Sequence, residues 1–270
     1  MSTFRRGATP PDPASVAAEI NRDYYAGLTA GREDYWRKMA APRHRMAVFS
    51  TLLRVDQPAS LVDLGCGNGV ALERLSQYVS GPELAGVDLS ETQIAENRRR
   101  RPDMEWAAMD LDGPVRFSAD WRGRFQAILA TEVVEHLDHP EDFLRSVRQL
   151  AVPDRGRLYL STQSGALRET ERRVGHRLHF SAGEMTALLA KTGWRVLRVW
   201  NTGYPFHDLS KWYANRDPDK SMQRFGEQPY GWSENLVCAA LRLMFRLNSS
   251  HRGAQLFAVA ERPGAEAEAA

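Results

Sequence analysis

Short apolar runs alternate with segments of helical periodicity along most of this chain. Residues 142–150 illustrate the helical pattern, because the apolar side chains at 143, 144, 147 and 150 fall on one helix face. Strands that alternate with helices build a parallel sheet with helices on both faces, so the pattern predicts an α/β fold. The runs that predict strands are 61–64, 84–88, 106–111, 125–132, 156–162, 194–200 and 255–261.

Three glycines at alternate positions follow the first predicted strand. Asp63 lies near the end of that strand, the glycines are Gly65, Gly67 and Gly69, and a helical pattern begins at Val70. Glycine lets the backbone turn sharply and approach a ligand closely, since a Cβ would occupy the ligand's space. The first N–H groups of the helix add free donors. A dinucleotide-binding turn has its third glycine at the sixth position, where this chain has Val70, so that fingerprint is excluded.

The next two predicted strands also end in carboxylates. Asp88 closes the second strand, and Asp110 lies at the end of the third. In a strand–helix–strand unit, the acid after the second strand lies beside the glycine turn, where it can accept both ribose hydroxyls of a nucleoside. The fourth strand, 125–132, continues into Val133-Val134-Glu135-His136.

These four motifs, in this order and spacing, resemble the class I S-adenosylmethionine-dependent methyltransferases of the small-molecule type, such as the O-methyltransferases of ubiquinone biosynthesis. The resemblance implies a Rossmann-like α/β fold: a seven-stranded, mostly parallel sheet with an antiparallel last strand, plus a helical cap. It also implies S-adenosyl-L-methionine as cofactor. The expected reaction is methyl transfer to a small-molecule acceptor, in bacterial metabolism of the natural-product or quinone type. A hydroxyl oxygen is the favoured acceptor atom, and nitrogen and carbon stay open.

The same resemblance assigns parts of the donor to particular residues. Asp63 and the glycine turn are expected to hold the methionine part, Asp88 the ribose, and Asp110 with its neighbours the adenine. The expected cofactor-binding residues are Asp63, Gly65, Cys66, Gly67, Asn68, Gly69, Asp88, Leu89, Met109, Asp110, Leu111 and Thr131.

Composition limits the other classes of protein. The 270 residues, 43% of them hydrophobic, suffice for one sizeable core with an added cap. A net charge of +2 argues against a long nucleic acid as partner, because such partners demand a basic face. Two cysteines give no disulfide framework, and we find neither a signal peptide nor a membrane-spanning stretch. We therefore expect a cytoplasmic protein, monomeric or homodimeric, that acts away from membranes.

Three parts are expected along the chain. Residues 1–55 form an N-terminal helical cap, residues 56–262 the methyltransferase domain, and residues 263–270 a disordered tail. Residues 201–254 separate the last two predicted strands, and so long an insertion is typical of a lid or a binding element. We expect this insertion to bind the acceptor.

Aromatic residues support that expectation. Tyr204, Phe206 and Trp212 in the insertion, with Tyr25 from the N-terminal helices, are expected to contact an aromatic or hydrophobic acceptor. The same aromatics can instead pack the insertion onto the sheet. The apolar stripe within residues 236–247 predicts core packing or a dimer contact.

Methyl transfer from a sulfonium is an in-line displacement, so the protein mainly aligns donor and acceptor. A hydroxyl acceptor also needs a general base near the end of the fourth strand, where donor and acceptor meet. His136 and Glu132 are the expected catalytic residues, since an imidazole titrates near neutral pH. Alternatively, the imidazole only positions a neighbouring loop through a hydrogen bond.

Two other functions stay open. Glu132, Glu135 and His136 with the later His179 resemble the metal site of the small-RNA 2′-O-methyltransferases, in which a divalent ion would hold a substrate hydroxyl. The same string occurs in relatives without metal, so no metal is assigned. The second alternative is a non-catalytic module that binds S-adenosylmethionine and acts through a partner.

Overall fold

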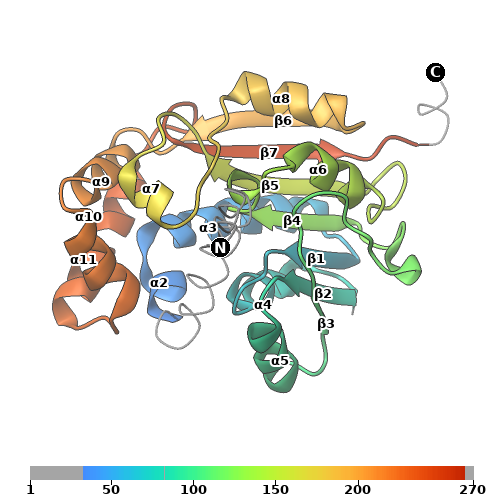
Figure 1. Cartoon of the computed structure of the whole chain (residues 1–270), viewed down its shortest axis with the longest axis horizontal. Coiled ribbons are helices and arrows are strands. Elements are labelled where there is room, and N and C mark those ends of the chain that lie inside the picture. The colour runs from blue at the N-terminus through green and yellow to red at the C-terminus, as the bar shows by residue number, and fades with distance from the viewer. Residues whose placement is uncertain (1–32, 82, 265–270) are drawn as a thin grey trace, which may run out of the picture.

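A seven-stranded sheet forms the centre of the protein in the computed structural model, which describes residues 33–81 and 83–264 (Figure 1). The order across the sheet is β3-β2-β1-β4-β5-β7-β6. β7 is antiparallel to β5 and β6, and the other neighbouring pairs are parallel. The predicted fold class is confirmed. The strands are β1 (Ser60–Leu64), β2 (Glu83–Asp88), β3 (Glu105–Ala108), β4 (Ala127–Thr131), β5 (Arg157–Gln163), β6 (Arg195–Thr202) and β7 (Gln255–Glu261).

Helices connect these strands and extend the molecule at one end. The α-helices of the described residues are α2 (Glu33–Lys38), α3 (Ala40–Asp56), α4 (Val70–Leu75), α5 (Glu91–Arg100), α6 (Pro140–Arg148), α7 (Glu169–Arg173), α8 (Ala182–Lys191), α9 (Phe206–Ala214), α10 (Pro218–Met222) and α11 (Trp232–Phe245). The 3-10 helices are η1 (Ser76–Tyr78), η2 (Ala119–Trp121) and η3 (Val134–His136), and η4 (Gln223–Glu227) is a π-helix.

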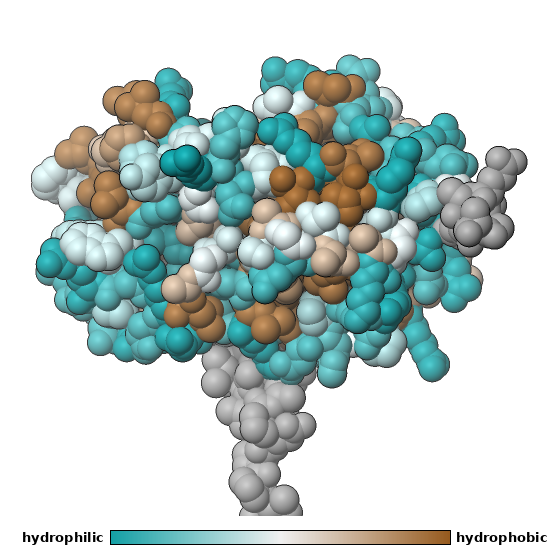
Figure 2. Space-filling view, turned by 90° about the horizontal axis from the view of Figure 1, so that it is seen from above, coloured by the Kyte–Doolittle hydropathy of each residue, from teal (hydrophilic) through white to brown (hydrophobic). Residues whose placement is uncertain are grey.

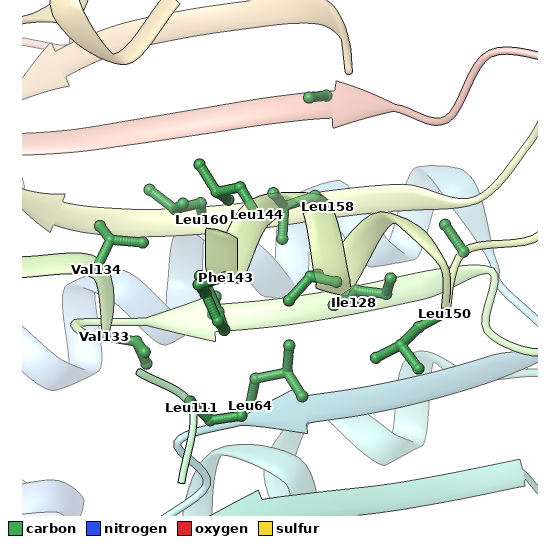
Figure 3. Packing of buried hydrophobic residues seen from close by; sticks show 14 of the residues in the cluster. Leu64, Leu111, Ile128, Val133, Val134, Phe143, Leu144, Leu150, Leu158 and Leu160 are labelled. Atoms are coloured by element: carbon green, nitrogen blue, oxygen red, sulfur yellow. The ribbon is translucent and has the colours of Figure 1, made fainter. Parts of the chain in front are cut away.

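The sheet is buried on both faces because neighbouring strand residues point to opposite sides and both sides are apolar. Leu61 of β1 belongs to a cluster with residues of α3, α4 and α5 on one face. Val62 belongs to the cluster on the other face, which α6 and α8 cover. Figure 3 shows this second cluster, where Phe143 of α6 lies against strand residues that include Ile128.

The N-terminal helices and the insertion between β6 and β7 come together at the same end of the molecule, beside the sheet (Figure 1). The predicted insertion contains α9, α10, η4 and α11. Its link to α2 includes a hydrogen bond from the Tyr230 N–H to Asp34 Oδ2 (2.9 Å). Of the predicted cap, residues 33–38 and 40–55 are helical, and residues 1–32 lie outside the described part. The division at residue 55 stays a prediction, and α3 also packs on the sheet.

Some element ends differ from the predicted ones. The third strand ends at Ala108 and not at Leu111, since Asp110 Oδ1 accepts a hydrogen bond from the Asp112 N–H (2.9 Å) and bends the chain into a turn. Of the predicted tail, Pro263 and Gly264 are described, and residues 265–270 are not. Within the described ranges, no helix has both the length and the apolar character that a bilayer crossing needs.

Candidate active site

The glycine turn joins β1 to α4 with a backbone that glycine adopts readily. Gly65, Gly67 and Gly69 have φ values of 73°, 49° and 72°, in the left-handed region. A Cβ on Gly65 would lie 2.6 Å from Cγ2 of Val133, so this residue packs tightly against the segment after β4. A Cβ on Gly67 would meet no atom within 4 Å. Gly67 therefore faces open space that a ligand can fill.

The Asp88 carboxylate ties the end of β2 to this turn. Oδ2 accepts a hydrogen bond from the Gly67 N–H (2.8 Å), and Oδ1 accepts one from the Ser90 N–H (3.0 Å). Burial raises the pKa of Asp88, and the N–H groups of Ser90, Gly67 and Leu89 act in the opposite direction. Each carboxylate oxygen keeps a further lone pair, so Asp88 has acceptors for two ribose hydroxyls.

A cavity opens beside this turn, and we call it the donor cavity. The predicted cofactor-binding residues that line it are Gly65, Gly67, Asp88, Leu89, Met109, Asp110, Leu111 and Thr131. The two predicted catalytic residues, Glu132 and His136, line it as well. The open face of Gly67 and the Asp88 oxygens fit the amino-acid and nucleoside parts of S-adenosylmethionine, which these residues would hold.

Four predicted cofactor residues lie outside the lining of the donor cavity and build the turn behind it. Asp63 is buried, and burial together with nearby Asp88 raises its pKa well above the usual value. Cys66 is also buried, with its sulfur packed toward Gly86 of β2. The Asn68 side chain accepts a hydrogen bond from the Val70 N–H (3.3 Å), and Gly69 is the N-cap of α4.

Six residues that line the donor cavity are absent from the predicted sets, namely Trp36, Ser90, Asp112, Val133, Leu137 and Arg177. Trp36 of α2 belongs to the wall, as do Asp112 and Arg177. Asp112 Oδ1 accepts hydrogen bonds from the N–H groups of Asp138 (3.1 Å) and His139 (2.9 Å), and Arg177 forms an ion pair with Asp138. The adjacent aromatics at 35 and 36 on a helix were a signal for Trp36, whereas the pattern near Arg177, which includes His179, pointed to a metal site.

Glu132 lies at the end of β4 with φ 55°, an uncommon value for a residue other than glycine. Its side chain forms an ion pair with Arg45 (3.4 Å) and accepts hydrogen bonds from Gln163 and from Ser161 (3.2 Å). Burial alone would raise the pKa of Glu132, but Arg45, Gln163 and Lys211 outweigh it and hold this pKa below its usual value. The carboxylate is therefore ionised at neutral pH.

His136 ends the short helix η3 and faces the donor cavity. Burial lowers the pKa of its imidazole to about 4, so the ring is neutral at pH 7. The His136 ring lies 4.7 Å from the ring of His176, measured between centroids. A neutral imidazole in this place can accept a proton from an acceptor molecule or bind a metal ion.

The side chains that could hold a metal are a partly different set from the predicted one. In the part of the chain that the structure describes, the ligand atoms of Glu135, His136 and His176 lie within 4.8 Å of one another. Glu132 and His179 are not part of this group. His179 Nε2 instead contacts His176 Nδ1 (3.1 Å), where it can orient the His176 ring. One carboxylate and two imidazoles suit zinc or manganese.

A second, larger cavity of about 850 Å³ adjoins the first, and we call it the acceptor cavity. Glu132 lines both cavities, which therefore adjoin at this residue. Of the predicted substrate residues, Phe206 and Trp212 line the acceptor cavity. Tyr204 does not and is 55% exposed, and Tyr25 lies outside the described residues. Most of the wall is apolar and includes Met39, Val174, Leu209, Phe225, Val237, Leu241 and Met244.

Polar residues of the acceptor cavity are joined in one network. Lys211 Nζ contacts Glu171 Oε1 (2.9 Å) and donates to Gln163 Oε1 (2.8 Å). Gln163 in turn donates to Glu132, which pairs with Arg45. Both cations thus have a carboxylate partner within the protein. Sequence reasoning missed this network, because its five members come from five separate segments.

Comparisons with known proteins agree with this geometry. A family described as a methyltransferase domain matches residues 32–199. The chain is 29% identical over 109 residues to the mitochondrial ubiquinone biosynthesis O-methyltransferase of Saccharomyces cerevisiae, a match that covers 38% of this chain and 33% of the yeast protein. It is 27% identical over 175 residues to the same-named protein of Arabidopsis thaliana, with 57% of this chain and 53% of that protein covered. The matches thus span about half or less of these relatives.

A solved structure extends the likeness to the whole fold. The 1,6-didemethyltoxoflavin-N1-methyltransferase of Burkholderia thailandensis, with 1,6-didemethyltoxoflavin and S-adenosylhomocysteine bound, has a TM-score of 0.59 at 16% identity. The match covers 96% of this chain and 93% of that one. At this identity the likeness concerns the fold alone. The family match, together with the glycine turn and the sheet order, shows that the chain belongs to the methyltransferase-domain family, among the class I S-adenosylmethionine-dependent methyltransferases.

Proposed function

We propose that the protein transfers a methyl group from S-adenosylmethionine to a hydroxyl oxygen of a small, uncharged and largely apolar acceptor. The observation that carries the proposal is the place of Glu132, which lines both cavities. Donor and acceptor bound in adjoining cavities would meet at Glu132. Direct displacement requires that the two reacting groups be close together and aligned.

Two side chains supply what a hydroxyl acceptor needs. When bound, S-adenosylmethionine supplies an electrophilic methyl group on a sulfonium. His136 is neutral and can take the hydroxyl proton on an imidazole nitrogen. Glu132 stays ionised and stabilises the imidazolium that forms, since its charge favours protonation of His136.

The walls of the acceptor cavity support the class of acceptor. Apolar side chains form most of its surface, which favours a hydrophobic molecule. Lys211 and Arg45 are already paired with Glu171 and Glu132, so an anionic group would have to compete with these carboxylates. An uncharged phenol or alcohol disturbs neither pair.

Donor binding and acceptor chemistry are tested separately. Calorimetry of the full chain is expected to show binding of S-adenosylmethionine and of S-adenosylhomocysteine. A methylation screen with matched phenol, aniline and thiol analogues then identifies the acceptor atom. We expect the phenols to react, His136→Asn to lower kcat, and the exposed His251→Asn to leave it unchanged. A preference for the anilines would refute oxygen as the target, and donor binding without turnover of any analogue would favour a non-catalytic binding module.

The group of Glu135, His136 and His176 supports a second candidate, a metal-dependent variant of the same reaction. A divalent ion there would lower the pKa of the acceptor hydroxyl. Activity that survives thorough chelation, and that His176→Ala leaves intact, excludes it. The apolar acceptor cavity and the net charge of +2 argue against RNA as the acceptor of such an enzyme.

A further inference from the structure

Lys211 of α9 is a partly buried cation in the wall of the acceptor cavity. Its Nζ contacts Glu171 Oε1 (2.9 Å) and donates a hydrogen bond to Gln163 Oε1 (2.8 Å). An ammonium group has three N–H donors, and these two contacts use two of them. Within residues 33–81 and 83–264, no further group accepts a hydrogen bond from Lys211. One N–H is therefore left for a molecule in the cavity.

The polar groups of this cavity lie at its buried end, and its mouth is apolar. The side chains of Lys211, Glu171 and Glu132 are 16%, 7% and 12% exposed. Leu209 and Trp212, which line the same cavity from α9, are 54% and 48% exposed. Figure 1 shows α9 at one end of the molecule, and Figure 2 shows apolar patches among hydrophilic surface at that end. An acceptor that fills the cavity thus brings its inner part against the polar groups.

A purely apolar group at the buried end would bind at a cost. A molecule that fills the cavity displaces water from Lys211, since most of the remaining wall is apolar. A buried donor that loses water and gains no partner costs more free energy than a satisfied hydrogen bond contributes. A site of this kind selects molecules that supply the missing partner and rejects similar molecules that lack it.

The charges around Lys211 favour a neutral oxygen over an anionic one. Arg45 and Glu132 form the second ion pair of the network, so two cations balance two carboxylates. Burial raises the pKa of Glu171, but Lys211 and backbone hydrogen bonds outweigh it and hold this pKa below its usual value, so the carboxyl group is ionised. An anionic group on the acceptor would therefore meet two carboxylates. A carbonyl oxygen accepts a hydrogen bond and adds no charge.

Gln163 links Lys211 to the point where methyl transfer is proposed to occur. Its carboxamide accepts from Lys211 at Oε1 and donates to Glu132 from Nε2. One carboxamide group therefore separates the ammonium of Lys211 from the carboxylate of Glu132. An oxygen bound to Lys211 and a hydroxyl bound beside Glu132 then belong to neighbouring parts of one acceptor molecule.

We propose that the acceptor carries a neutral carbonyl oxygen in addition to its reacting hydroxyl, and that Lys211 selects such acceptors by donating a hydrogen bond to this oxygen. The inference rests on the proposed function, because the molecule that is methylated has to occupy the acceptor cavity. It narrows the acceptors to phenols and alcohols that also bear a ketone, an ester or an amide.

Calorimetry on the full chain saturated with S-adenosylhomocysteine tests the inference without methyl transfer. The ligands are 4-butylphenol, 4-(2-oxobutyl)phenol and 4-(3-oxobutyl)phenol. In both ketones, methylene groups insulate the carbonyl from the ring, so the acidity of the hydroxyl stays nearly the same. A ketone is less hydrophobic than the alkyl chain that it replaces and binds an apolar wall more weakly. We nevertheless expect at least one ketone to bind roughly tenfold more tightly than 4-butylphenol, because its oxygen pairs with a charged donor.

A double variant tests the role of Lys211. Lys211→Met together with Glu171→Gln removes the N–H donor without leaving a buried carboxylate unpaired. We expect this variant to lose the roughly tenfold preference for the ketone. Lys220→Met, which removes an exposed lysine of α10, should retain it. An unchanged affinity of the double variant for S-adenosylhomocysteine shows that its fold is intact.

The possible results separate this inference from the proposed function. If the native protein binds neither ketone more tightly than 4-butylphenol, the inference is overturned, and methylation of a hydroxyl still stands. This comparison needs no variant, so it decides the question even if the double variant does not fold. A ketone preference that the folded double variant keeps also overturns the role of Lys211. Failure of all three phenols to bind refutes the proposed apolar acceptor, and the inference with it.

Discussion

Replacement of Arg45 tests whether Glu132 is held as a buried, ionised carboxylate. Arg45 is 3% exposed and lies 3.4 Å from a Glu132 oxygen. At this distance the attraction of the two charges is roughly 5 kcal/mol for an effective dielectric constant of about 20. Loss of one partner of a buried pair typically costs about 3–5 kcal/mol. Because Gln163 and Ser161 still bind Glu132, we expect Arg45→Met to lower the free energy of unfolding by about 3 kcal/mol at pH 7.

Urea denaturation measures this loss and separates its causes. If the uncompensated charge is the cause, Arg45→Met with Glu132→Gln should recover most of the lost stability. As a control, Arg99→Met removes an exposed pair with Glu96 and should change stability by less than about 1 kcal/mol. A loss below about 1 kcal/mol for Arg45→Met, or a double variant in which the losses simply add, would refute the buried-pair reasoning.

We also expect the stability difference between the native protein and Arg45→Met to change with pH in a defined direction. In the native protein the pKa of Glu132 is lowered, so this group stabilises the fold at neutral pH and loses that contribution as the pH falls through its folded pKa. Without Arg45, burial dominates and raises the pKa of Glu132. The stability gap between native protein and Arg45→Met should therefore be widest at neutral pH. It should shrink as the pH falls from the raised pKa of Glu132 in the variant to the lowered pKa of Glu132 in the native protein. A gap that stays constant down to the acid transition contradicts this mechanism.

Other substitutions test the donor site and the core. Gly65→Ala would place a carbon 2.6 Å from Cγ2 of Val133 at a positive φ. We expect the free energy of unfolding to fall by about 2 kcal/mol or more and donor binding to be lost. As a control, Gly183→Ala should be tolerated, because its new Cβ would meet no atom within 4 Å. Phe143→Ala empties a fully buried position and should cost about 3–5 kcal/mol by thermal or urea unfolding. Asp88→Asn should weaken S-adenosylmethionine binding at least about tenfold in calorimetry, and an unchanged affinity would remove Asp88 from the donor site.

The gathering of most predicted donor residues around one cavity was predictable because they follow consecutive strand ends. Parallel strands bring their carboxyl ends to one edge of the sheet, so residues that follow the strands, such as Gly67, Asp88 and Asp110, meet there whatever the loops do. Sequence reasoning could not separate residues that line the cavity from residues that shape the turn. Cys66 and Asn68 belong to the second kind because their side chains point back into the turn and the helix start.

The acceptor side was less predictable because its contacts join distant segments. Lys211 meets Glu171 across 40 positions and Gln163 across 48, and no local pattern reveals such pairs. The histidines after α7 show the same limit. Gly175 has a positive φ of 86°, and the turn there brings His176 next to His136. His179 contacts the His176 ring instead. Side-chain direction in a loop depends on such turns, and the sequence does not specify them.

The two ends of the insertion are joined at its base. Thr202 and Gln255, the last residue of β6 and the first of β7, are register partners, and hydrogen bonds link Tyr204 with Ser249 (2.7 Å) and with Arg252 (3.0 Å). The segment between them therefore leaves the sheet and returns to it at one point. Its length and sequence can diverge at little entropic cost to the rest of the fold, because the chain ends it joins are already fixed. The part of the acceptor-cavity wall that α9 and α11 supply can therefore change without any change in the glycine turn between β1 and α4.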